Sequence, residues 1–283
     1  MASMGISEHF GSEAVDFDPA MLSPFALHRL VEGEIIPRLL LAHRDATPTT
    51  TPAEFDGDLP LHFANSALHQ EAYALLVEID ALIASGVSVE GVFLEVLAPA
   101  ARHLGEMWDA DECDFVDVTM ALWRLQEIVH ELAARMPGAA ERRGGERRAL
   151  FAPLPGEQHG FGSMMVEEFF RRAGWTTHSE PGASEAELLA LVGMRWFEMV
   201  GLTVSVAENA ARLPALIATL RAASRNPRLG VMVGGRVFVD HPDWARGCGA
   251  DATAADARQA VLVAETLLDV LALRADTPAA GNG

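Results

Sequence analysis

The chain has 283 residues, enough for two modest domains, and half of them are hydrophobic, so each domain can bury a core. It carries 40 acidic against 21 basic residues, a formal net charge of −19. Proteins that bind nucleic acid need clustered Lys and Arg to neutralise phosphates, so this balance argues against direct DNA binding. No apolar run approaches the roughly 20 residues of a membrane span, and no basic, apolar leader follows Met1. We therefore expect a cytoplasmic protein without membrane contact.

Neither the cysteines nor the arginine-rich run predicts a binding site. Cys113 and Cys248 match no CxxC spacing, so neither a disulfide framework nor a zinc site is indicated. We interpret the one dense basic run as a solvated linker rather than as a phosphate-binding patch. This run holds four arginines beside two glycines: Arg142, Arg143, Arg147 and Arg148.

The first half of the chain reads as helical. Residues 1–55 form an extension with one amphipathic helix at about residues 25–43, which Pro37 kinks or restarts. Residues 56–138 carry apolar stripes at steps of three and four, so several helices should close into a small bundle. A Gly- and Arg-rich linker at residues 139–147 follows, and residues 277–283 form a tail.

In residues 148–276 the spacing of apolar residues no longer follows the helical pattern of the first half. Short apolar runs alternate there with helical stretches, which predicts a flavodoxin-like (Rossmann-like) parallel sheet with helices on both faces. Ligands of such sheets bind beyond the carboxyl ends of the strands. The predicted strands lie near residues 149–152, 175–178, 200–204, 230–233 and 248–250, and the helices near residues 162–173, 185–195, 209–224 and 254–273.

The segment from Glu157 to Gly162 follows the first predicted strand directly, where a ligand is expected. His159 is the candidate metal ligand of this segment. Glu157 could accept a hydrogen bond from one imidazole nitrogen and so raise the basicity of the other. Gly160 and Gly162 would let a bulky ligand approach the backbone closely.

Small residues also end two later strands. Thr203 closes the third predicted strand, Ser205 follows it, and Gly234 and Gly235 close the fourth, so small groups would line a cleft at this edge of the sheet. Together with the segment that contains His159, these residues resemble the cobalamin-binding domain of methionine synthase and its relatives. The motifs of that family read Asp-x-His-x-x-Gly, Ser-x-Leu and Gly-Gly.

The resemblance implies that His159 displaces the benzimidazole base from cobalt. The displaced base would enter the core beside Thr203, and the glycine pair would make room for it. The sequence departs from the family in three places: Glu157 replaces Asp, Thr203 replaces Ser, and Ser205 replaces Leu. The first two changes keep a carboxylate and a hydroxyl, and the third makes the pocket for the base more polar.

The predicted bundle resembles the helical cap of cobalamin photoreceptors of the light-dependent repressor type. These carry a Trp, then nine residues, then Glu-His, all facing the upper side of the corrin. Here Trp108 is followed after nine residues by Val118 and Thr119, which keeps an aromatic lid and loses the polar pair. His103, just before Trp108, is a further candidate for reaching an upper ligand.

Together with the stretches at residues 34–40 and 123–126, this Trp with Val-Thr resembles the AerR/PpaA family of purple photosynthetic bacteria. The resemblance implies a non-enzymatic, light- or redox-responsive regulator that binds cobalamin and acts as an antirepressor of the DNA-binding repressor CrtJ/PpsR. The upper ligand, hydroxo, aquo or adenosyl, stays open, and haem is an alternative cofactor. A corrinoid-carrying module of a B12-dependent methyltransferase or mutase is the alternative function.

Overall fold

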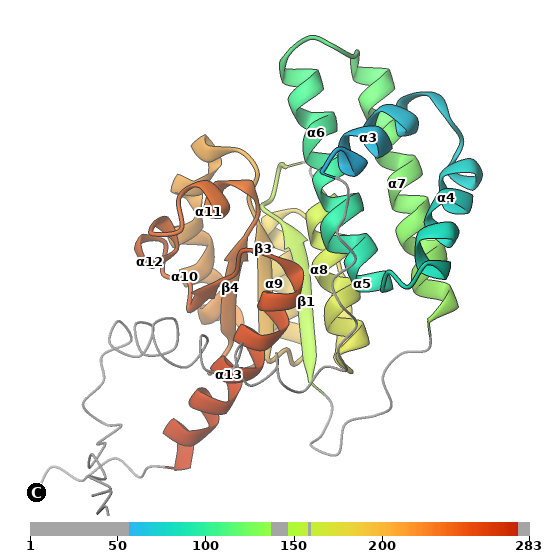
Figure 1. Cartoon of the computed structure of the whole chain (residues 1–283). Helices are drawn as coiled ribbons and strands as arrows, with labels where there is room; N and C mark the ends of the chain where they lie inside the picture. Colours follow the sequence, from blue (N-terminus) through green and yellow to red (C-terminus); the bar gives the residue numbers. More distant parts are fainter. Residues whose placement is uncertain (1–56, 137–146, 158–159, 277–283) are drawn as a thin grey trace, which may run out of the picture.

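The computed structural model describes residues 57–136, 147–157 and 160–276. A helical cap precedes a domain in which helices flank a parallel sheet, and the cap stands beside one face of this sheet (Figure 1). The helix predicted at residues 25–43 lies outside the described residues. Within those residues, no helix is long and apolar enough to cross a bilayer.

The cap consists of packed amphipathic helices, as the stripes of apolar residues predict. Its last helix begins with a capping box: the Asp117 N–H donates to the Asp114 carboxylate at 2.8 Å, and the Asp114 N–H donates to Asp117 at 3.3 Å. The elements of the cap are α3 (Leu59–His69), α4 (Ala72–Ala84), α5 (Val89–Gly91), η3 (Val92–Leu97), α6 (Ala98–Asp109) and α7 (Phe115–Arg135).

A π-helical segment lets one long helix accommodate a proline. Pro99 lacks the N–H that an α-helix interior requires, and its ring would crowd the preceding turn. The backbone widens just before it, and the Ala98 N–H bonds to Phe93 five residues earlier. Elements α5, η3 and α6 therefore run on without a break to Trp108, at the far end of α6.

The second domain has a five-stranded, fully parallel sheet in the order β2-β1-β3-β4-β5. This confirms the predicted flavodoxin-like class, with a helical cap in front of it. Because all strands run the same way, the loops that follow β1, β3 and β4 meet at one edge. The strands are β1 (Arg148–Pro153), β2 (Thr176–Ser179), β3 (Met199–Thr203), β4 (Gly230–Gly234) and β5 (Ala252–Thr253).

Alternating side chains of the strands pack into two cores, one on each face of the sheet. In β1, Phe151 packs into the core shared with α8, α13 and the cap, while Leu150 packs with α9 and α10 on the other face. The connecting elements are α8 (Phe161–Arg172), α9 (Glu185–Met194), η4 (Ala207–Arg212), α10 (Leu213–Ala223), α11 (Arg236–Asp240), α12 (Trp244–Gly247) and α13 (Ala257–Asp276).

Two sequence predictions need correction. The fifth strand is not at residues 248–250: Cys248 ends α12, and its N–H donates to Trp244, so pairing with β4 begins only at Ala252. Arg147, assigned to the solvated linker, is tied to the domain instead. It pairs with Asp269 at 3.2 Å and lies over the ring of Trp175.

The cap packs on α8 and α13 through both apolar and charged groups. The rings of Phe93 and Phe169 lie 6.1 Å apart, and Arg171 donates to the carbonyl of Ala133 at 3.2 Å. Glu90 of the cap pairs with Arg258 of α13 at 3.3 Å. The shared core and these polar contacts fix the cap beside the sheet.

Candidate functional site

Glu157, in the loop after β1, is the carboxylate of the predicted site, and it is buried, with 7% of its surface exposed. It accepts hydrogen bonds from the backbone N–H of Ser205 at 2.8 Å and of Val206 at 3.3 Å, and from the Asn209 side chain at 3.1 Å. Donors of this kind stabilise a buried carboxylate. The residue proposed to orient a histidine therefore also joins the loop after β1 to the loop after β3.

Arg212 strengthens the same junction. Its guanidinium donates to the carbonyl of Pro155 at 2.8 Å, and it lies next to Gly156, whose positive φ of 93° suits glycine. Arg212 and Asn209 both belong to η4, so this short helix holds the loop after β1 at two points.

A pair of hydroxyls lies where α8 meets the end of β3. Ser163, with 2% of its surface exposed, donates to the hydroxyl of Thr203 at 2.7 Å. A Cβ added at Gly162 would lie 3.6 Å from the Thr203 methyl group, so the glycine lets α8 come close to the strand. The predicted residues Gly162 and Thr203 are thus brought together, and Ser163 joins them.

The two glycines after β4 differ in what surrounds them. Gly235 has a φ of 98°, and a Cβ there would collide with the backbone of Val204, so the fold itself requires glycine. A Cβ at Gly234 would meet no atom within 4 Å. The absence of a side chain at Gly234 therefore leaves open space beside Thr203, its partner in the sheet.

The predicted metal ligand His159 and its neighbour Gln158 lie outside the described residues. Gly160 is described: it precedes α8, and a Cβ there would be 3.9 Å from Pro181. Elsewhere in the part of the chain that the structure describes, no three His, Cys, Asp or Glu side chains gather closely enough to hold a metal ion. His159 thus remains the predicted ligand.

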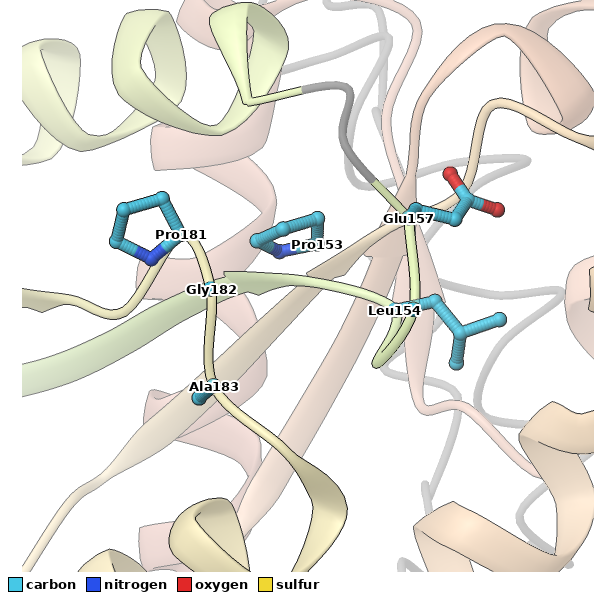
Figure 2. A pocket seen from close by; sticks show the side chains of 7 residues that line it. Pro153, Leu154, Glu157, Pro181, Gly182 and Ala183 are labelled. Carbon is cyan, nitrogen blue, oxygen red and sulfur yellow. The ribbon is translucent and has the colours of Figure 1, made fainter.

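A pocket of about 260 Å³ opens at the same edge of the sheet, between the loops that follow β1 and β2. Figure 2 shows Pro153 and Pro181 on one side of it and the Glu157 carboxylate turned away from both. This direction agrees with the hydrogen bonds that the Glu157 carboxylate accepts from Ser205 and Asn209, which follow β3. Of the predicted site residues that the structure describes, Glu157 alone lines this pocket.

The cap reaches the same edge through the end of α6. Asp109 lies 3.8 Å from Arg236, the residue directly after Gly235. Trp108 precedes Asp109 and is 45% exposed, so it is not a core residue of the cap. The structure therefore brings the predicted lid residue close to the loop that follows β4.

Other cap residues of the prediction are arranged differently. Val118 is buried in the core, whereas Thr119 is exposed and donates to the carbonyl of Phe115 at 2.6 Å. Only Thr119 of this pair is therefore open to solvent. His103 is about 140° around the helix from Trp108, and it bonds to Glu106 at 3.0 Å. It faces away from the side of α6 that carries Trp108.

Reasoning from the sequence missed three residues of the site. Ser163, Asn209 and Arg212 contact predicted site residues or their loop, yet each is 40 or more positions from its partner in the sequence. None of the three belongs to a motif that the sequence analysis used. They could have been suspected only from their position in the first turns that follow β1 and β3, at the ligand edge of the sheet.

Comparisons with known proteins agree with this geometry. Residues 147–262 match the family model of the B12 binding domain. The monomethylamine corrinoid protein of Methanosarcina barkeri shares the fold, with a TM-score of 0.60 and 15% identity, over 74% of this chain and 96% of that one. The chain therefore contains a B12-binding domain behind a helical region, and such a domain implies a corrinoid cofactor.

A curated protein also matches part of the chain. The uncharacterized 20.5 kDa protein in the bchF-crtJ intergenic region of Rhodobacter capsulatus is 28% identical over 172 residues. The match covers 61% of this chain and 89% of the relative.

The described residues fit a corrinoid. Gly234 leaves open space beside Thr203, and the half-buried hydroxyl of Thr203 and the buried hydroxyl of Ser163 can bond to a polar ring or ribose. Glu157 and η4 hold the loop that carries the predicted cobalt ligand. A bound corrinoid would supply a cobalt centre whose upper ligand can be exchanged.

Proposed function

We propose that this protein is a cobalamin-dependent regulator that acts as an antirepressor on a DNA-binding repressor of the CrtJ/PpsR type. It would bind its partner rather than catalyse a reaction. The observation that carries the proposal is the likeness to a protein encoded beside crtJ in Rhodobacter capsulatus. The resemblance of the cap and of the site to the AerR/PpaA family supports the same function.

The geometry offers a route for the signal. A change of the upper ligand would act first on Trp108, which is exposed and directly precedes Asp109, the cap residue that lies 3.8 Å from Arg236. A ligand alters an equilibrium only through different affinities for two states. Light or redox state would act here by changing the contacts between the corrin and the end of α6.

A gel-shift titration tests this function. Repressor and operator DNA are mixed with the protein loaded with hydroxocobalamin, with the apo protein, or with His159→Ala. We expect the loaded form to change the DNA affinity of the repressor more than the other two, and the chain alone to leave DNA unshifted. Equal effects of all three forms, or tight DNA binding by the chain alone, would contradict the proposal.

One observation favours a second function. The fold is shared with the monomethylamine corrinoid protein, which supports a corrinoid-carrying module of a methyltransferase. In that case the reduced, cobalamin-loaded chain should accept a methyl group on cobalt from a partner enzyme's substrate and pass it on in repeated turnovers. A regulator should show no such turnover.

A further inference from the structure

The first half of α7 carries apolar side chains on its outer face as well as on its inner one. Val116, Met120 and Trp123 follow one another at steps of four and three, so they form a single stripe along the helix. Val116 is 64% exposed and Trp123 is 58% exposed. We call these three residues the α7 stripe.

The inner face of α7 packs into the core of the cap. Val118, Leu125 and Ile128 on that face are buried in the core of the cap. The α7 stripe therefore contributes little to the packing of the described residues. Exposed aromatic residues in a contiguous patch are typical of protein interfaces, where Trp often carries much of the binding energy.

The surroundings of the α7 stripe are acidic. Between Gly105 and Trp123 the chain has six acidic residues and neither Lys nor Arg, and all six are exposed. The first basic residue after them, Arg124, is mostly buried and donates to the carbonyl of Ala67. The acidic residues are Glu106, Asp109, Asp111, Glu112, Asp114 and Asp117.

We propose that the α7 stripe with its acidic rim is the surface that docks a basic protein partner, and this rests on the proposed antirepressor function. A DNA-binding repressor has the required positive charge, and complementary charge steers association. Trp123 would be the central apolar anchor, and the acidic rim would speed the encounter. The stripe belongs to the helix that follows Trp108, so partner and cofactor would meet the same end of the cap.

Charge disfavours two other occupants of the α7 stripe. A second copy would bring two acidic rims together, on chains that each carry a formal net charge of −19. Residues 1–56 of the same chain have nine acidic residues against three arginines, so they would also meet the rim with like charge. A basic partner is the occupant that the charges fit.

The test compares two tryptophans in the full chain, loaded with hydroxocobalamin in the dark. Binding to immobilised repressor is measured for the wild type, Trp123→Ala and the control Trp196→Ala, which alters an exposed Trp just before β3. We expect Trp123→Ala to weaken binding about 10-fold or more, mainly through faster dissociation, and Trp196→Ala to leave it unchanged. The cobalamin spectrum of all three should be the same.

A second pair of substitutions tests the rim. Asp111→Asn with Glu112→Gln should lower the association rate and flatten its dependence on salt, because both side chains are exposed and belong to the rim. These residues are not part of the helix cap formed by Asp114 and Asp117. An association rate that stays the same at low salt would contradict the role of the rim.

The outcomes separate the two proposals. If the wild type binds the repressor and Trp123→Ala binds equally well, the docking surface is wrong and the antirepressor function stands. If the wild type binds no repressor in any cofactor state, both proposals fail. If sedimentation shows a wild-type dimer that Trp123→Ala converts to monomer, the stripe is a self-interface and the docking proposal is overturned.

Discussion

The Asn209 side chain donates to the Glu157 carboxylate at 3.1 Å, across 52 positions of the sequence. This bond ties η4 to the loop that leads to the predicted cobalt ligand. It makes Asn209 a positioning residue, because it acts through Glu157 and the loop rather than on the cofactor itself.

Replacing Asn209 with Ala should loosen this loop. Loss of one donor to a buried carboxylate costs about 1–3 kcal/mol, and two backbone donors remain, so we expect the low end of that range. Cobalamin should be released faster than from the wild type. Thermal melts and cofactor release rates check this, with Asn65→Ala as the control, since the exposed Asn65 amide donates to the carbonyl of Leu61 within the cap. Equal release from both variants would contradict the role of Asn209.

The glycine pair after β4 gives a sharper comparison. Gly234→Ala should keep the melting temperature of the apo protein, because nothing lies within 4 Å of the added Cβ, yet it should lower cobalamin affinity by filling the space beside Thr203. Gly235→Ala should instead destabilise the apo protein by roughly 1–3 kcal/mol, because its backbone has positive φ and the Cβ collides with Val204. Calorimetry with and without hydroxocobalamin separates the two effects. Normal cobalamin binding by Gly234→Ala would show that the cofactor does not occupy the space beside Thr203.

Ser163→Ala removes one half of the hydroxyl pair. We expect the free energy of unfolding to fall by about 1 kcal/mol, because the half-buried Thr203 hydroxyl loses the donor that the buried Ser163 supplies. Urea unfolding measures this against Ser85→Ala, in which an exposed hydroxyl that bonds to Leu82 is lost. Equal stability of the two variants would show that the pair with Thr203 contributes nothing.

Trp108→Ala tests the lid. Since Trp108 is 45% exposed, its loss should change the melting temperature far less than the removal of a core aromatic, which costs about 3–5 kcal/mol. The rate at which the upper ligand of bound hydroxocobalamin exchanges with cyanide should rise. Stopped-flow absorption gives this rate. An exchange rate equal to that of the wild type would show that Trp108 does not act as a lid.

The sequence was informative where local pattern and chain order determine structure. Thr203 and Gly234 could be placed at strand ends because short apolar runs stop there, and parallel order brings such ends to one edge. The strand at Ala252 was misplaced because it has only two residues, too few to show a period.

Contacts between distant segments could not be predicted in this way. Ser163 meets Thr203 across 40 positions, and Glu157 meets Asn209 across 52, so only the packed fold shows these pairs. Exposure is equally hidden from periodicity, because the exposed α7 stripe of Val116, Met120 and Trp123 has the same helical spacing as buried residues.

The most direct test of the account is the absorption spectrum of the protein after incubation with hydroxocobalamin in the dark and gel filtration. We predict that the wild type retains cobalamin with a spectrum shifted by a histidine ligand. His159→Ala should lose the cofactor or the shift while keeping its fold. A wild-type protein that retains no corrinoid, that retains haem instead, or that matches His159→Ala in spectrum and retention would contradict cobalt ligation at His159.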